Sequence, residues 1–346
     1  MSVNSTSESQ RLSLRQLLLA DVALLAVAVI WGVNIPVMKV ALESGITPYS
    51  LNAIRLVVSA IVLLGCAGWE YRTGVRPAAG ISRVRILIYA LIVSVAYQYL
   101  FLMAVSRTTS ANVALIMATV PMWTALGARL FLKEILPAMA WVGLLIAFTG
   151  TMIVTVQKQA TPLAEVTISE VVGSEQAANA SELAPGPIID EVKSRQSDLD
   201  AATRFSGNMI ALLAALTWAS GTVFSRPMLK LISPVQLAAC SATIGLPFHV
   251  LFAWPTLAVS IPLLQETSLQ VCILYSGILS TGLALAMWSY GVKHAGAAQA
   301  TMFQNLSPIV AIVSAWLWRG ESISIAQTIG GAMIISGLVI MRRSRS

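Results

Sequence analysis

The sequence has 346 residues, of which 57% are hydrophobic and only 11% are charged, and its formal net charge is +7. A soluble domain carries about 25% charged residues, so this chain lacks the polar surface that a water-exposed globular protein needs. We therefore expect a membrane protein, because a spanning helix uses about 20 apolar residues and the chain holds enough of them for ten spans.

Ten apolar segments follow one another along the chain, and short loops join most of them, so neighbouring helices must be antiparallel. The long unbroken apolar runs favour helices, since the strands of a membrane barrel would alternate in polarity. The predicted fold is therefore an all-α integral membrane protein. Its predicted spans are 20–41, 47–69, 84–105, 109–131, 135–156, 207–229, 234–256, 268–291, 295–318 and 322–341.

Three polar segments flank or interrupt these spans. We expect residues 1–19 to form an N-terminal tail and residues 342–346 a basic C-terminal tail, both in the cytoplasm. Residues 157–205 hold eight of the 15 acidic residues, and they separate two five-helix domains, 20–156 and 206–341. Because this segment cannot bury enough apolar surface to fold alone, we expect a disordered linker outside the cytoplasm. The apolar run after the N-terminal tail is too long for a cleavable signal peptide.

The two halves repeat each other at an offset of 187 residues, and no gap is needed between residues 31 and 153. Since each half has five spans, an odd number, the second half must cross the membrane in the opposite orientation. Inverted repeats of this kind recur in secondary transporters, which bind their substrate near the midplane between the halves. The rare residues that pair at this offset are Trp31 with Trp218, Pro121 with Pro308, Glu134 with Glu321, Gly143 with Gly330 and Gly150 with Gly337.

The basic residues predict the orientation. With the N-terminus in the cytoplasm, 14 of the 22 Lys and Arg residues fall in cytoplasmic segments, and the short outer loops hold only Lys39, Arg107 and Arg319. This bias follows the positive-inside rule, so we predict a multi-pass inner-membrane protein with both termini in the cytoplasm. The net charge of +7 then reflects topology and attraction to anionic lipid, and nucleic acid is not an expected partner.

Several short motifs of the sequence resemble those of a known family. Trp31-Gly32-x-Asn34, with Lys39 later, looks like the first helix of the EamA family in the drug/metabolite transporter superfamily. Further elements are similar to that family's fourth helix, to the turn after it and to their counterparts in the second half. They are Ala111–Ala114 up to Pro121, Leu130–Glu134, Ala297–Ala300, Leu306–Pro308 and Gly320-Glu321.

The resemblance covers nearly all of residues 20–341 except the linker. It implies ten helices, cytoplasmic termini and transport of small solutes, often the export of amino acids or related metabolites. The sequence departs from the family pattern in two places. The linker is unusually long, and the second half reads Trp218-Ala219 where the first reads Trp31-Gly32.

Eight side chains within the spans are candidates for lining a substrate cavity between the halves. Amides in hydrocarbon need hydrogen-bond partners, so they should face the interior of the bundle. The matched tryptophans lie too deep to belong to an interfacial belt. Contact with substrate and simple helix packing both stay open for each of them. The candidates are Trp31, Asn34, Tyr97, Asn112, Trp218, Tyr290, Gln299 and Asn305.

Five other residues are candidates for charge, gating or helix-bending roles. Arg55 lies about 10 Å along its helix from the outer end, where it could bind a substrate carboxylate, pair with an acidic group or extend outward. Glu134 and Glu321 stand at span ends, where they either cap the next helix or form gating ion pairs. Pro121 and Pro308 are expected to kink spans four and nine.

No cofactor is predicted. Cys66, Cys240 and Cys272 lie in apolar runs without metal-ligand spacing, and the chain lacks a Walker motif for ATP. We therefore predict a carrier and not an enzyme: an exporter of amino acids or of related neutral or zwitterionic solutes. An importer or exchanger of another small solute, such as a nucleoside or polyamine, is the alternative. Two further alternatives are less favoured. One is a sensor or assembly protein that uses the acidic loop, and the other is an enzyme acting on lipid-linked substrates.

Overall fold

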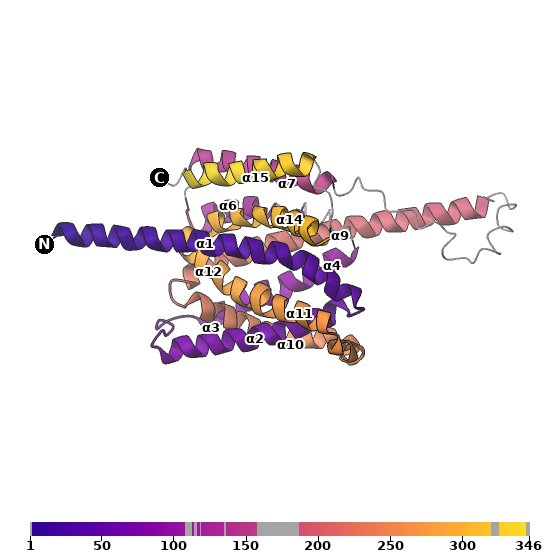
Figure 1. Ribbon diagram of the computed structural model, residues 1–346, viewed down its shortest axis with the longest axis horizontal. Helices are drawn as coiled ribbons and strands as arrows, with labels where there is room; N and C mark the ends of the chain where they lie inside the picture. Colours follow the sequence, from indigo (N-terminus) through magenta and orange to yellow (C-terminus); the bar gives the residue numbers. More distant parts are fainter. Residues whose placement is uncertain are drawn as a thin grey trace.

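The computed structural model describes residues 2–107, 113, 116–117, 119–134, 136–157, 187–319 and 325–343. Every regular element in these ranges is a helix, and the helices pack side by side into one bundle (Figure 1). The all-helical prediction is therefore confirmed for the described part of the chain. Asn112 and Glu321 lie outside the described residues.

The first half begins with two long helices, and its third predicted span consists of three consecutive segments. A π-helical segment, η1, joins the two α-helical parts of that span. The elements of this half are α1 (Ser2–Glu43), α2 (Pro48–Arg72), α3 (Arg83–Ala90), η1 (Leu91–Ala96), α4 (Tyr97–Arg107), α6 (Val120–Phe131) and α7 (Ala138–Gln157).

The second half follows the same order. Its π-helical segment, η4, includes residues 278–283, which align with η1 at the repeat offset. The elements of this half are α9 (Pro187–Met228), α10 (Pro234–Ser260), η3 (Pro262–Gln265), α11 (Thr267–Leu274), η4 (Tyr275–Leu283), α12 (Ala284–Ala295), α13 (Ala297–Phe303), η5 (Gln304–Leu306), α14 (Ser307–Arg319) and α15 (Ile325–Arg343).

Six helical stretches in the described residues are long and apolar enough to cross a membrane. The predicted spans four, five, nine and ten correspond to shorter helices, so the total of ten spans stays a prediction. The six stretches are Leu14–Glu43, Pro48–Arg72, Arg83–Ala104, Phe205–Met228, Pro234–Ser260 and Thr267–Ala295.

Two predicted boundaries differ from the structure. α1 already begins at Ser2 and α9 at Pro187, so residues 2–19 and 187–205 are helical. In the linker, acidic residues precede basic ones by four positions at Glu191/Arg195 and Asp200/Arg204, a spacing that stabilises a helix. Extending an existing helix also avoids the cost of nucleating a new one. The expectation of a disordered linker is therefore wrong for residues 187–205, and residues 158–186 lie outside the described part of the chain.

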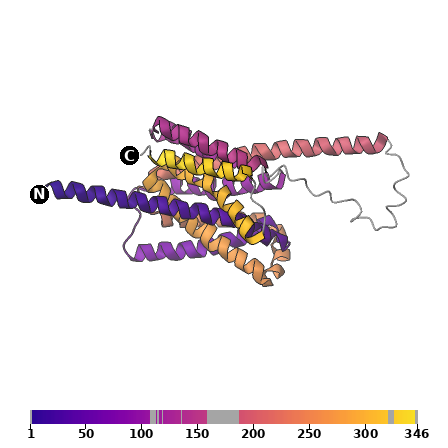
Figure 2. The ribbon, with the colours of Figure 1, turned by 45° about the horizontal axis from the view of Figure 1, so that its top comes forward.

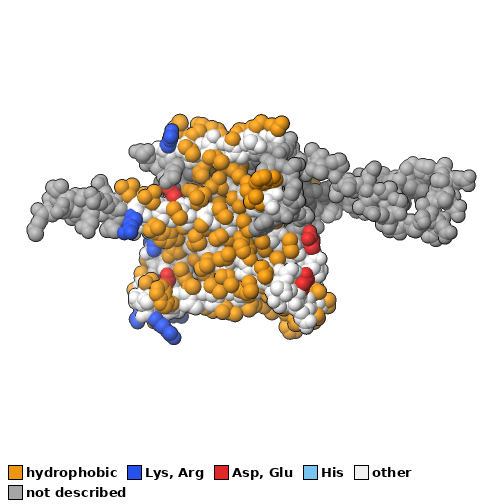
Figure 3. Space-filling view, viewed as in Figure 1, with side chains coloured by type: hydrophobic (Ala, Val, Ile, Leu, Met, Phe, Trp, Pro, Cys, Tyr) orange, Lys and Arg blue, Asp and Glu red, His pale blue; other side chains and the backbone are white. Residues whose placement is uncertain are grey.

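The two ends of the bundle differ in charge. α1 begins and α15 ends at the same end of the molecule, whereas α9 begins at the opposite end (Figure 1). On the face shown in Figure 3, Lys and Arg atoms gather at the end where the chain begins and ends. Hydrophobic atoms cover the middle of this face. Many large apolar side chains of the protein are exposed, Leu251 and Leu317 among them. A broad apolar surface of this kind suits contact with lipid.

The last helices of the two halves, α7 and α15, pack against each other through four glycines, and both views show them side by side (Figures 1 and 2). A methyl group on Gly150 would lie 2.5 Å from the carbonyl oxygen of Gly330, and one on Gly337 would overlap the carbonyl oxygen of Gly143. Small residues of this kind let helix backbones approach closely in membranes.

These two glycine contacts are repeat equivalents of each other, because Gly143 matches Gly330 and Gly150 matches Gly337 at the offset of 187 residues. The pairing of Gly150 with Gly330 and of Gly143 with Gly337 means that α7 and α15 run antiparallel. Halves with the same orientation would instead place matched helices parallel. The glycine contacts therefore indicate that the two halves are inverted relative to each other, as in carriers with inverted repeats.

The halves are also interleaved. α1 contacts α12 and α14 of the second half, and α9 makes the equivalent contacts with α4 and α6 of the first. A residue near the middle of α1 or α9 is therefore placed between the two halves.

Candidate functional site

Three tryptophans and one tyrosine form a cluster of rings between the two halves, which we call the aromatic cluster: Trp31, Trp218, Trp288 and Tyr97. The ring centroids of Trp31 lie 5.8 Å from those of Trp218 and 5.4 Å from those of Trp288. Trp218 lies 5.8 Å from Trp288 and 4.7 Å from Tyr97. The cluster thus joins α1 and α4 of the first half to α9 and α12 of the second.

Hydrogen bonds to the π-helical segment η4 fix the first helix beside the cluster. The indole N–H of Trp31 donates to the carbonyl oxygen of Ser280 at 3.0 Å. One turn away, the hydroxyl of Tyr275 donates to the carbonyl oxygen of Ile30 at 3.1 Å. π-Helical segments occur mostly as single turns and often at functional sites. The two that the described residues form, η1 and η4, both adjoin the cluster, since Tyr97 directly follows η1.

Two rings of the aromatic cluster are buried, and the other two, Trp31 and Tyr97, are half-buried. Trp218 is 5% exposed and Trp288 is 3% exposed, and both belong to the main apolar core. In this conformation the rings fill the place where the sequence predicts a substrate cavity. The Nε1 atom of Trp218 is buried and has no hydrogen-bond partner among the described residues. Because a buried indole N–H usually finds a partner, this donor is available to a ligand.

Three amides near the break in the ninth predicted span also have buried, unpartnered atoms. They are the Oδ1 atom of Asn34, the Oε1 atom of Gln304 and the Nδ2 atom of Asn305. Gln304 and Asn305 lie in η5, which contacts α1, the helix that carries Asn34. Leaving a buried polar atom unsatisfied costs about 1–3 kcal/mol, so these amides offer both donors and acceptors to a small polar ligand.

The two prolines stand where helical structure changes. Pro308 lies in the first turn of α14, directly after the 3₁₀ turn η5. Pro121 lies in the first turn of α6, after Thr119, whose hydroxyl donates to the carbonyl oxygen of Ile116 at 2.6 Å. A proline lacks the N–H that would continue the preceding helix, which accounts for both positions.

The structure separates the sequence-predicted cavity residues into two groups. Trp31, Trp218 and Tyr97 come together, and Asn34 and Asn305 lie on contacting elements. Tyr290 instead stacks on His294, one turn along α12, with ring centroids 4.4 Å apart. Gln299 is half-buried on α13 and does not belong to the aromatic cluster.

Sequence reasoning missed Trp288 and Gln304. A signal for Trp288 was present, because its repeat partner is Phe101, which lies 5.9 Å from Tyr97 between ring centroids. Scoring every aromatic pair at the repeat offset would have found it. Gln304 gave no comparable signal, because its repeat partner is Met117.

Arg55 is buried, with 8% of its surface exposed, and its contacts are polar but uncharged. Its Nη2 atom donates to the Oδ1 atom of Asn52 at 3.1 Å, and its Nη1 atom approaches the sulfur of Met38 at 2.9 Å. The Nδ2 atom of Asn52 lies 3.1 Å from the Nδ1 atom of His249, whose Nε2 atom lies 2.5 Å from the carbonyl oxygen of Ser94. A chain of hydrogen bonds therefore runs from Arg55 in α2 to His249 in α10.

Glu134 forms an ion pair that joins the two halves near the end of the bundle that holds the termini. Its Oε1 atom accepts from the Nε atom of Arg226 at 3.2 Å, and both side chains are about three-quarters buried. Arg226 also donates to the carbonyl oxygens of Val292 and Lys293, at the last turn of α12. A cation at this position satisfies free carbonyls of a helix C-terminus.

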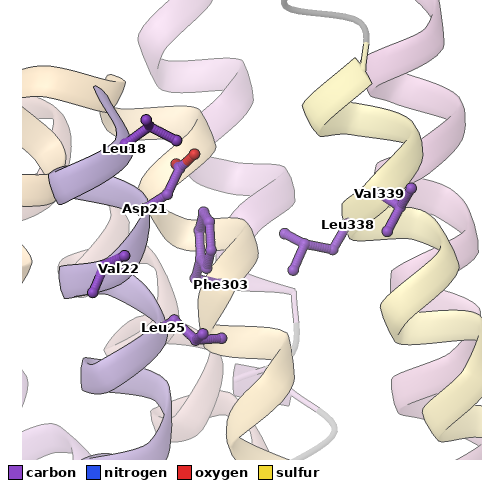
Figure 4. A pocket seen from close by; sticks show the side chains of 7 residues that line it. All are labelled: Leu18, Asp21, Val22, Leu25, Phe303, Leu338 and Val339. Carbon is purple, nitrogen blue, oxygen red and sulfur yellow. The ribbon is translucent and has the colours of Figure 1, made fainter. Parts of the chain in front are cut away.

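A shallow groove of about 200 Å³ lies between α1, α13 and α15 (Figure 4). Its walls are apolar except for Asp21, and its lining residues are Leu18, Asp21, Val22, Leu25, Phe303, Leu338 and Val339. The groove lies outside the aromatic cluster. Its apolar walls suit lipid chains rather than a polar solute.

The described residues hold no group of three or more His, Cys, Asp or Glu side chains that could bind a metal ion. Cys66, Cys240 and Cys272 are free thiols.

Comparison with known proteins finds one family in both halves of the chain. The model of the EamA-like transporter family matches residues 18–156 and again residues 205–343. A solved crystal structure superposes with a TM-score of 0.68 at 16% identity, over 94% of this chain and 99% of that chain, which shows a shared fold.

Relatives of similar length are transporters. An uncharacterized transporter of Bacillus subtilis, YoaV, is 21% identical over 91% of this chain and 94% of its own length. A probable terminal-alkyne amino-acid exporter of Streptantibioticus cattleyicolor is 25% identical over 93% of this chain and 92% of its own length. With both halves matched by the family model, this chain is a multi-pass membrane protein that belongs to the EamA-like transporter family.

Proposed function

We propose that the protein is a secondary carrier that exports amino acids or related neutral or zwitterionic solutes by alternating access between its halves. The observation that carries this proposal is the aromatic cluster, which both halves build and which adjoins unsatisfied buried donors and acceptors. Aromatic walls with a few fixed polar groups are typical of small-molecule sites. The amino-acid class rests on one relative that carries the name of an amino-acid exporter.

The transport cycle that we propose starts from the packed aromatic cluster. Because Trp218 and Trp288 are buried, substrate reaches the site only when the halves part at one end. The ion pair between Glu134 and Arg226 links the halves at the end that holds the termini, so breaking this pair opens a path from that side. The indole N–H of Trp218 and the amides of Asn34 and Asn305 then bind the polar groups of the substrate.

The termini lie in the cytoplasm of an inner-membrane protein in this proposal. α2, α9 and α15 end, and α3 begins, on the side where the chain begins and ends (Figure 1). Basic residues stand at or just after these helix ends, as the positive-inside rule requires: Arg72, Arg83, Lys230 and Arg343. A green fluorescent protein fused after the C-terminus should fluoresce in cells. Loss of fluorescence there, with alkaline phosphatase activity at the same fusion point, would place the termini outside.

The two partners of the Glu134–Arg226 ion pair differ in how many contacts they make, so substituting each of them should have a different effect on transport. Arg226→Gln is expected to reduce flux more than Glu134→Gln, because Arg226 also holds two carbonyl groups of α12. Hydrogen bonds to charged groups contribute about 1.5–3 kcal/mol, so we expect roughly a tenfold or greater loss of flux for Arg226→Gln and a smaller loss for Glu134→Gln. Initial rates in proteoliposomes measure both.

The matched control for this test is Arg129→Gln, because Arg129 is an exposed arginine at the same end of the bundle. Its flux should equal that of the wild type. An equal loss in all three variants, or a larger loss for Glu134→Gln than for Arg226→Gln, would contradict the proposed link between the halves.

An importer or exchanger of another small solute is the alternative, since the fold is symmetric in direction. A sensor or assembly function would instead depend on the acidic segment. Replacing residues 158–186 with a flexible Gly/Ser linker of equal length separates these functions, because a carrier keeps its flux and a sensor loses its activity.

Growth on toxic solutes tests the exporter function in cells. Cells that overproduce the protein should tolerate toxic amino-acid analogues at concentrations that stop control cells, because export lowers the internal concentration. Cells with equal amounts of the Trp218→Ala variant should lose that tolerance. Equal sensitivity of all three strains across the whole panel would count against export.

A further inference from the structure

Arg55 is a buried cation that has no counter-ion in the part of the chain that the structure describes. It is 92% buried within a predicted span, and no carboxylate among the described residues lies within ion-pair distance of it. A charged side chain in the membrane interior is costly unless it is paired or hydrogen-bonded. An anion would balance this charge, and a transported solute can supply that anion.

The guanidinium group of Arg55 has N–H donors that its present contacts do not use. Of its five N–H groups, one donates to the amide oxygen of Asn52 and one approaches the sulfur of Met38, a weak acceptor. The buried Nε–H has no hydrogen-bond partner among the described residues. A carboxylate accepts two parallel hydrogen bonds from a guanidinium group, so it could satisfy the free Nε–H together with an N–H of the neighbouring Nη2 atom.

The hydrogen-bond chain from α2 to α10 holds Arg55 in place from one side only. Asn52 accepts from Arg55 and approaches the Nδ1 atom of His249, while the Nε2 atom of His249 approaches the Ser94 carbonyl oxygen. Since the Ser94 carbonyl can only accept, the Nε2 atom carries the proton and the Nδ1 atom accepts from Asn52. The amide oxygen of Asn52 is thereby directed at Arg55, and this chain adds no negative charge.

Arg55 also adjoins the aromatic cluster. α2, the helix of Arg55, packs on η4, and η4 in turn packs on α1 and α12, which carry Trp31 and Trp288. In addition, the backbone of Arg55 packs on Gly277 of η4, the segment whose Ser280 carbonyl binds Trp31. A small solute could therefore touch Arg55 with one end and the cluster with the other.

We propose that Arg55 binds the carboxylate of the transported solute, and that Asn52 and His249 are positioning residues that orient its guanidinium group. This inference rests on the proposed carrier function and narrows it, because it makes a carboxylate group necessary for tight recognition. It excludes polyamines and nucleosides as good substrates. The apolar part of the solute then lies against the aromatic cluster.

Competition in proteoliposomes tests the role of the carboxylate. Labelled L-amino acids, spermidine and uridine are offered to the wild-type protein, and each amino acid that moves is competed with its unlabelled acid and its unlabelled α-carboxamide. The acid should compete about ten- to a hundredfold better than the amide, the range expected for a hydrogen-bonded charge pair. Arg55→Gln should reduce that preference to about threefold or less while the amide still competes.

Two more variants keep the test independent of protein folding. Arg55→Lys keeps the charge but lacks the planar donor fork, so its preference for the acid should lie between those of the wild type and Arg55→Gln. Asn52→Asp adds a carboxylate beside an intact Arg55, so it should also abolish the preference. Arg107→Gln changes an exposed arginine and is the control.

The outcomes separate the two proposals. A folded Arg55→Gln or Asn52→Asp variant that transports and still prefers the acid as strongly as the wild type overturns the role of Arg55. Wild-type protein that moves only spermidine or uridine overturns the carboxylate requirement and leaves the carrier function standing. Wild-type protein that moves nothing overturns the carrier function together with this inference.

Discussion

Alanine at Gly150 or Gly337 is expected to destabilise the protein, although alanine is a better helix former than glycine. The added methyl group on Gly150 would lie 2.5 Å from the Gly330 carbonyl oxygen and 2.8 Å from the Cβ atom of Met333. Real Cβ atoms do not approach other atoms so closely, so α7 and α15 must separate. Overpacking of this kind costs about 1–3 kcal/mol at each site, which corresponds to a decrease in Tm of roughly 2–12 °C.

The matched controls are Gly65→Ala and Gly68→Ala in α2, where the added methyl group meets no atom within 4 Å. These substitutions should leave Tm unchanged or raise it, because the helix gains up to about 1 kcal/mol from alanine. The Tm of each of the four variants is measured by heating samples and quantifying the remaining folded protein by size-exclusion chromatography. Equal Tm values for Gly150→Ala and the wild type would show that the two helices do not meet as described.

Removing the side chain of Trp218 is expected to abolish transport. Its ring contacts Trp31, Trp288 and Tyr97, so Trp218→Ala removes the centre of the cluster and leaves a cavity there. Truncations of this size cost about 3–5 kcal/mol. We expect the initial rate of flux in proteoliposomes to fall more than about tenfold for any substrate that the wild-type protein moves.

Trp218→Phe distinguishes binding from packing, because phenylalanine keeps an aromatic ring but lacks the indole N–H. If that unpartnered N–H binds substrate, this variant should raise the half-saturation concentration about tenfold at an unchanged maximal rate. Trp254→Phe is the control, since Trp254 is 72% exposed on the surface of the bundle. An unchanged half-saturation concentration in Trp218→Phe would assign Trp218 to packing alone.

The sequence predicts much of the fold because membrane spans and inverted repeats leave strong signals. Apolar length places the helices, and an odd number of spans per half predicts inversion. The match of Gly143 with Gly330 and of Gly150 with Gly337 could be found without a structure. Their crossed contacts could not, because a repeat offset shows which residues correspond but not which residues touch.

The candidate site is harder to predict, because its geometry depends on tertiary contacts. Trp31 and Trp218 were found through their shared position in the repeat, whereas Trp288 comes from a span rich in other apolar residues. The breaks at η1 and η4 have no marker such as proline, so their π-helical bonding could not be expected. Arg55 was recognised as unusual, but its chain of partners joins Asn52 to a histidine 197 residues away in the sequence.

The helical part of the polar segment shows a different limit. Composition favoured disorder for residues 157–205, but a charged sequence directly before a span can continue the helix of that span. α9 therefore begins at Pro187, well before the apolar residues. Composition averaged over a segment does not detect such an extension, whereas the spacing of opposite charges does.

Counterflow in proteoliposomes tests whether a small solute crosses between the two halves at the aromatic cluster. Vesicles with purified wild-type protein are loaded with one unlabelled L-amino acid and diluted into a trace of the same labelled amino acid, and each L-amino acid is tested in turn. We expect a transient accumulation of label for at least one amino acid and none with Trp218→Ala. Folded wild-type protein that accumulates no amino acid, or a Trp218→Ala variant that accumulates as much as the wild type, would contradict this expectation.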